Sequence, residues 1–117
     1  MGFKDLKKRF TATTDEVNQV RLQERFCDVD VRRICDTVAR HPARICGEIS
    51  SLQVVPRAGS PSLEVTVDDG SGRAVAVFSG RKRIAGIEPG RGIVLEGVAG
   101  EAKGRLQLLN PAYTLLA

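Results

Sequence analysis

The residues with the most evident chemistry in this chain are cations. Arg81, Lys82 and Arg83 form its densest basic cluster in the second half of the sequence. A guanidinium group can bind a phosphate through two parallel hydrogen bonds, whereas a lysine binds it as a point charge. A run of three charges is also typical of a solvent-exposed turn, so both interpretations stay open. The net charge of +4 permits an anionic partner without requiring one.

The other reactive side chains form no catalytic or metal-binding pattern. His41 is the only histidine. The three cysteines are widely spaced and include no C-x-x-C pair: Cys27, Cys35 and Cys46. A zinc site needs closer ligands, and free thiols fit a reducing cytoplasm better than a disulfide scaffold does. No apolar run approaches the about 20 residues that span a bilayer. We therefore expect a cytoplasmic protein that is not an enzyme and has no metal, no cofactor and no membrane partner.

The strongest structural pattern lies at residues 63–79, L-E-V-T-V-D-D-G-S-G-R-A-V-A-V-F-S. Apolar residues alternate with polar or small ones on both sides of a glycine-rich turn, which predicts two strands joined as a hairpin. Gly70 and Gly72 can adopt left-handed backbone angles at no steric cost. Asp68 and Asp69 are adjacent and point apart at a strand end, so they serve a turn better than paired acid–base chemistry.

Proline and glycine divide the remaining chain into further strands. Gly47 falls inside the longest one and predicts a bulge or a bend there. The segment 80–92 is too glycine-rich for a full helix, which leaves at most one helical turn near 81–85. The predicted strands cover residues 43–55, 63–68, 73–79, 93–99 and 105–109.

The N-terminal part has a different character and predicts a helix. Thr13 and Glu16 have the spacing of a capping box, which would start a helix near residue 14. Val17, Val20 and Phe26 would form its apolar side. This stripe is thin, and such a helix is stable mainly when something packs against it. It would pack on the β domain, bind a partner or a second copy of the chain, or fray.

The order of these features resembles the OB-fold, a mainly β, five-stranded barrel that would here carry an N-terminal helical extension. Residues 44–111 are similar to OB domains of the tRNA-anticodon type, and most similar to the wedge domain of RecG-type helicases. The motor's phosphate loop is absent, so the chain resembles the stand-alone OB proteins of actinobacteria. The extension would cover 1–42 and the barrel 43–117. The motifs that carry the resemblance are R-I-C-G-E-I at 44–49, D-G-S-G at 69–72, V-F at 77–78, P-G at 89–90, L-E-G-V at 95–98 and L-N-P at 109–111.

The resemblance implies nucleic-acid binding across the outer face of the second and third strands, between the loops 56–61 and 100–104. Many relatives stack a base on an aromatic residue where this chain has Glu64. Phosphate contacts would then dominate, with little sequence preference, and we expect DNA rather than RNA. The cations expected to contact nucleic acid are Arg57, Arg73, Arg81, Lys82, Arg83, Lys103 and Arg105.

The strand pattern also predicts which side chains line this groove. Leu63, Val65 and Val67 would point inward, so that Glu64, Thr66 and Asp68 face outward; Leu106 and Leu108 would point inward, and Arg105 and Gln107 outward.

A second interpretation is an OB-fold that serves protein interaction or assembly without binding nucleic acid. The few aromatic residues, the carboxylate of Glu64 in the groove and the thin N-terminal helix favour it. The fold alone does not decide between the two.

Overall fold

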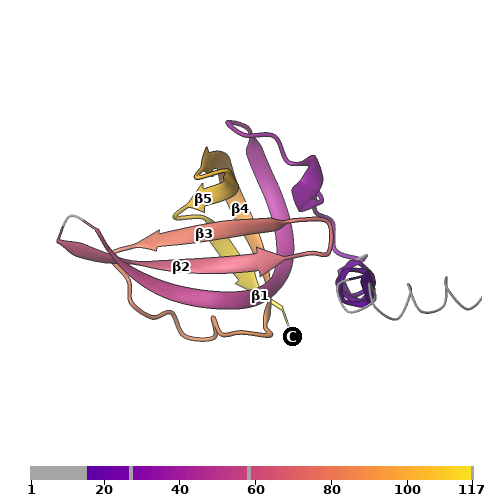
Figure 1. Ribbon diagram of the computed structural model, residues 1–117, viewed down its shortest axis with the longest axis horizontal. Coiled ribbons are helices and arrows are strands. Elements are labelled where there is room, and N and C mark those ends of the chain that lie inside the picture. Colours follow the sequence, from indigo (N-terminus) through magenta and orange to yellow (C-terminus); the bar gives the residue numbers. More distant parts are fainter. Residues whose placement is uncertain (1–15, 27, 58, 117) are drawn as a thin grey trace, which may run out of the picture.

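The computed structural model describes residues 16–26, 28–57 and 59–116, and it shows a β barrel with a helix at its side (Figure 1). The helix covers residues 16–25 of the described chain. A short 3-10 helix follows at η1 (Ile34–Asp36). The strands are β1 (Pro42–Arg57), β2 (Ser60–Asp68), β3 (Arg73–Ser79), β4 (Gly92–Ala102), β5 (Arg105–Leu109) and β6 (Ala112–Leu115).

The first five strands close into a ring in the order β1-β2-β3-β5-β4, and β4 pairs back with β1. All neighbours are antiparallel except β3 and β5, which run parallel. This ring of five strands confirms the predicted OB-fold barrel. Its closure leaves few strand edges open to solvent. The sixth strand was not predicted. β6 pairs with Ile93–Glu96 of β4, beyond the part of β4 that pairs with β5.

Because β1 is bent, it pairs with two different strands along its length. β1 pairs with β4 up to Glu48 and with β2 from Glu48 onward. A β-carbon at Gly47 would lie 3.0 Å from the carbonyl oxygen of Asp68, so the close approach of β2 requires glycine there. The register shifts between Ile49 and Ser51, which is a bulge. The sequence prediction of a bulge or bend near Gly47 is therefore confirmed.

The barrel interior is filled by the inward-facing residues of its strands. Leu63, Val65 and Val67 are buried in it, as the alternation predicted. Phe78 belongs to this core and meets the ring of Tyr113 edge to face, with the ring centroids 5.7 Å apart. The other buried members are Ile34, Ile45, Ile49, Ala74, Ala76, Ile84, Ile87, Ile93, Leu95 and Leu108.

The connection between β3 and β4 contains turns and no helical turn near 81–85, where the sequence allowed at most one. Ile84 and Ile87 are buried from this connection, and the amide of Ile87 donates to the carbonyl oxygen of Ile84. The apolar pair anchors the segment without helix, which agrees with its high glycine content.

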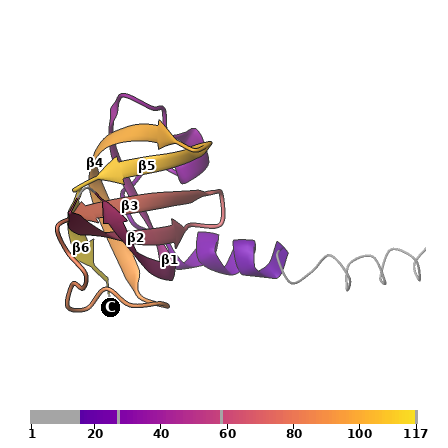
Figure 2. The same cartoon turned by 60° about the vertical axis from the view of Figure 1, so that its left-hand side comes forward.

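The N-terminal helix packs against the outside of the barrel through its C-terminal end, and the rest of it extends away from the strands (Figure 2). Leu22 and Phe26 are buried there against Cys46 of β1 and Val94 of β4. Burial raises the pKa of the Cys46 thiol to about 11. Of the three alternatives from the sequence, the structure shows the first: the helix packs on the β domain. No helix in the described part of the chain is long and apolar enough to cross a membrane.

The predicted apolar stripe of the helix was partly wrong. Phe26 is buried, but Val17 and Val20 are 61% and 52% exposed. Leu22 takes their place because it lies one turn before Phe26 and shares its face of the helix. The start predicted from Thr13 lies outside the described residues.

Two ion pairs also connect the helix to the outer face of β1. Glu48 accepts from Arg21 at 2.9 Å and from Arg25 at 2.5 Å. The hydrogen bond from Arg21 is the main reason why the pKa of Glu48 lies below its usual value. Arg25 donates further to the carbonyl oxygen of Gly90.

Candidate nucleic-acid interface

A concavity of about 390 Å³ opens on the outer face of the barrel, across β2, β3 and β5. This is the face that the resemblance assigned to binding. Its lining combines charged, amide and apolar side chains from five strands and one turn: Val55, Glu64, Val75, Ala102, Lys103, Arg105 and Gln107.

Strand alternation places the polar residues of this lining. Glu64 points outward between the buried Leu63 and Val65. On β5 the same alternation buries Leu108 and turns Gln107 outward. The outward orientation of these polar side chains confirms the sequence prediction.

The turn between β4 and β5 brings Lys103 to the rim of the concavity. Ala102 pairs with Arg105, which leaves Lys103 and Gly104 as a two-residue turn. Both have positive φ, 55° and 74°, as tight hairpin turns require. Lys103 and Arg105 therefore line the same concavity, although only one of them lies on a strand.

Arg73 lies at the same end of the parallel strands β3 and β5 as Arg105. Ala74 pairs with Leu106, so the residues that precede them stand at one level. Arg73 is exposed and donates to Asp68 at 3.2 Å. An exposed ion pair of this kind is weak, so a phosphate could compete for the guanidinium.

The basic cluster Arg81–Arg83 follows the opposite end of β3. Its three side chains are exposed and do not line the concavity. The preceding Gly80 donates its amide to the carbonyl oxygen of Pro61 at 2.8 Å. The cluster thus lies beside the start of β2, away from Lys103.

Arg57 is the last residue of β1 and pairs with Ser60, and its side chain falls outside the described part of the structure. Val55, two residues earlier, lines the concavity. Sequence reasoning placed Gln107 in the groove through the alternation of β5, and the structure agrees. It did not name Val55 or Val75, which look like ordinary strand residues.

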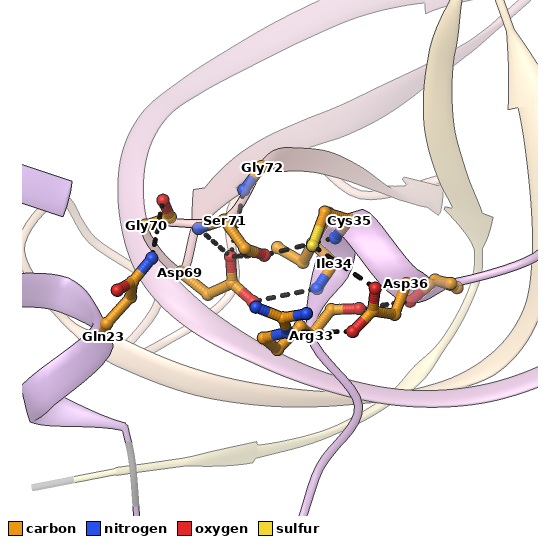
Figure 3. A network of polar contacts seen from close by, with 10 residues as sticks. Gln23, Arg33, Ile34, Cys35, Asp36, Asp69, Gly70, Ser71 and Gly72 are labelled. Atoms are coloured by element: carbon orange, nitrogen blue, oxygen red, sulfur yellow. Dashed lines mark hydrogen bonds and ion pairs between the residues drawn. The ribbon is translucent and has the colours of Figure 1, made fainter. Parts of the chain in front are cut away.

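The turn between β2 and β3 has a different role, which Figure 3 shows. Asp69 is only 7% exposed. Its Oδ1 accepts from the Ser71 amide at 2.8 Å, the Ser71 hydroxyl at 2.6 Å and the Gly72 amide at 3.1 Å. Its Oδ2 accepts from the amide of Ile34 at 2.9 Å. Asp69 thus shapes the turn, as predicted, and also binds η1.

The N-terminal helix contacts the same turn. Gln23 donates to the carbonyl oxygen of Gly70 at 3.3 Å. A β-carbon at Gly70 would lie 2.3 Å from the carbonyl oxygen of Gln19. Cys35 of η1 donates its amide to the hydroxyl of Ser71. The turn is therefore one of the places where the extension is joined to the barrel, and it is not a free binding loop.

The described residues contain no group of three or more His, Cys, Asp or Glu side chains that could hold a metal. Cys35 is exposed and Cys46 is buried, both as free thiols, and Cys27 lies outside the described residues.

Comparison with protein families identifies a family model that matches most of the chain. The family model tRNA_anti-codon, described as an OB-fold nucleic acid binding domain, matches residues 43–116. No curated protein matches the chain. The matched range contains the whole concavity and leaves the helix and η1 outside.

Proposed function

The chain belongs to the family of OB-fold nucleic-acid-binding domains of the tRNA-anticodon type, and we propose that it binds DNA along the concavity on β2, β3 and β5, without catalysis. The observation that carries this proposal is the presence of Lys103 and Arg105 in the lining of that concavity. Two cations at one side of a groove can hold successive phosphates of a strand.

The lining also supports low sequence specificity. Among the described lining residues there is no aromatic side chain on which a base could stack. Stacking is the main source of base contacts for OB-folds that bind single strands. Gln107 is the one amide in the lining, and Val55 and Val75 offer only apolar contact. Phosphate contacts then dominate the affinity.

The remaining cations extend the proposed contact in two directions. Arg73 would bind a phosphate beyond Arg105, in exchange for its exposed partner Asp68. Arg57 and the cluster Arg81–Arg83 would meet the nucleic acid at the other end of β3. The preference for DNA over RNA rests on the resemblance to the wedge domain of RecG-type helicases.

We further propose that the two parts of the chain have different roles. Residues 43–117 would bind the nucleic acid in the cytoplasm. Residues 1–42 would form an extension that is anchored at the turn around Asp69.

The test is fluorescence anisotropy with single-stranded, duplex and branched DNA, and with RNA, at about 50 mM and about 200 mM salt. The variant Lys103→Ala/Arg105→Ala removes two phosphate contacts. For single-stranded DNA each contact contributes about 0.7 to the salt slope, so the ratio of wild-type to variant affinity should shrink about sevenfold between these salt concentrations.

The matched control is Arg32→Ala/Arg33→Ala. It removes the same charge from exposed positions before η1 that do not line the concavity. Equal losses in both double variants would show that net charge, and not the concavity, provides the affinity. If no nucleic acid binds at the lower salt concentration, the protein-interaction alternative takes precedence.

A further inference from the structure

The outer half of β1 has an open edge. β1 pairs with β4 only as far as the pair Glu48–Gly92, and Ile49 then exchanges hydrogen bonds with Gly90 and Arg91. Beyond Ile49, β1 pairs with β2 alone. Figure 1 shows these two strands continuing past the end of β3 toward their connecting loop.

The neighbouring contacts determine which backbone groups face this edge. Pro61 accepts from the amide of Gly80, so its carbonyl points away from β1. Pro56 is paired with Pro61, and opposite residues of antiparallel strands direct their backbone groups either both toward each other or both away. The carbonyl of Pro56 therefore points away from β2. By alternation Val54 and Leu52 also face outward. Outside the strand ladders, no backbone hydrogen bond between described residues uses the amide or carbonyl of these two.

The edge also lacks the usual protection against pairing. Natural edge strands carry charges or prolines that prevent another strand from adding. Here the residues from Ile49 to Pro56 include no charge, in a chain of which 27% is charged. Leu52 and Val54 are 37% and 48% exposed. Pro56 lies at the outer end and the bulge between Ile49 and Ser51 at the inner end, so the stretch between them is the part open to pairing.

We propose that two copies of this chain pair through this edge, antiparallel about a two-fold axis at Gln53. In that register Leu52 of one copy faces Val54 of the second, and the reverse holds on the other side of the axis. Each such pair exchanges both of its backbone hydrogen bonds, which makes four across the interface. Pro56 would face Ser50 and end the ladder.

A second copy fits this edge because the edge is complementary to itself. The same patch serves both partners, as a two-fold interface requires. Apolar side chains meet across the axis on the face that carries Leu52 and Val54, and no like charges are opposed. Val55 on the opposite face lines the concavity. Pairing would therefore place two concavities on one surface; this last consequence alone rests on the proposed DNA binding.

The test is sedimentation velocity of the full chain without nucleic acid, from about 1 to about 100 µM. We expect a concentration-dependent rise toward twice the chain mass of 12.6 kDa. In hydrogen exchange, the amides of Leu52 and Val54 should become slower as the protein concentration rises. A wild type that stays monomeric at the highest concentration overturns the proposal.

Two substitutions at one position test the edge itself. Val54→Pro removes an outward amide without breaking a bond to β2, and Val54→Lys places two like charges as diagonal neighbours across the axis. Both should give monomers, and circular dichroism checks their fold. Val98→Lys is the matched control, because Val98 is an exposed valine on another strand. A dimer that resists both Val54 variants, or that is lost on Val17→Lys in the helix, contradicts pairing through β1.

Discussion

Replacing Asp69 by asparagine should loosen the attachment of η1 to the turn between β2 and β3. The two oxygens of Asp69 have different tasks: Oδ1 accepts three hydrogen bonds within the turn, and Oδ2 accepts the amide of Ile34. Asparagine keeps only one oxygen. Its amide group must therefore face either the Ile34 amide or the donors of the turn, and donor would oppose donor in a site that is only 7% exposed.

The loss of folding free energy depends on whether the donor that loses its acceptor is buried. A buried donor left without an acceptor costs about 1–3 kcal/mol, and a hydrogen bond to a charged acceptor is stronger than a neutral one. We expect Asp69→Asn to lower the free energy of unfolding by about 2–3 kcal/mol. That would be a large fraction of the about 5–15 kcal/mol typical of a whole domain.

Asp68→Asn provides a matched control at the neighbouring position. Asp68 pairs with Arg73, whose side chain is 73% exposed. An exposed pair contributes at most about 1 kcal/mol. Asparagine can still accept from the amide of Gly70, as Asp68 does at 2.8 Å. The control should therefore lose little stability although it makes the same chemical change.

Urea unfolding measures the difference. With a slope of about 1–3 kcal/mol per M, a loss of about 2–3 kcal/mol lowers the midpoint for Asp69→Asn by about 0.7–3 M. Limited proteolysis should also cleave the variant more readily between the helix and η1, because the Ile34 anchor is lost. Equal midpoints for the two variants would refute the claim that Asp69 anchors η1 to the turn.

Two further predictions concern the same contact between extension and barrel. Gly70→Ala should destabilise the protein far more than Gly80→Ala, measured by thermal unfolding: both glycines have positive φ, but only at Gly70 would the new carbon meet the Gln19 backbone. The pKa of Glu48 is lowered in the folded state, chiefly by Arg21, so its contribution is present above the unfolded value of 4.5 and lost as the pH falls through the lower folded value. Wild type should therefore lose stability on acidification more steeply than Glu48→Gln, and parallel pH curves would contradict this.

Local patterns in the sequence are sufficient to predict most of the barrel. Alternation between residues 63 and 79 placed Leu63 and Val65 inside and Glu64 outside, and the structure agrees. Gly47 predicted the bend of β1. These features depend on the period of a strand or on the steric needs of one residue, which the sequence contains directly. The short β6 was missed because its pairing with β4 depends on the closed barrel.

Tertiary packing decides which side chains of each element are buried and which ones line the concavity. The exposure of Val17 and Val20, and the burial of Leu22, depend on which face of the helix meets β1 and β4. Val75 and Gln107 line one concavity only because β3 and β5 pair in the folded barrel. Such partners are far apart in the chain, and no local period encodes them.

The turn around Asp69 shows both contributions. The segment D-D-G-S-G reverses the chain for local reasons that its sequence contains, because the glycines and the aspartate side chains favour a tight turn. That Asp69 also accepts the amide of Ile34, 35 residues earlier, is visible only in the folded protein. A hydrogen bond over that separation forms only once the barrel and the extension are folded together, so its physical cause lies in packing and not in the local sequence.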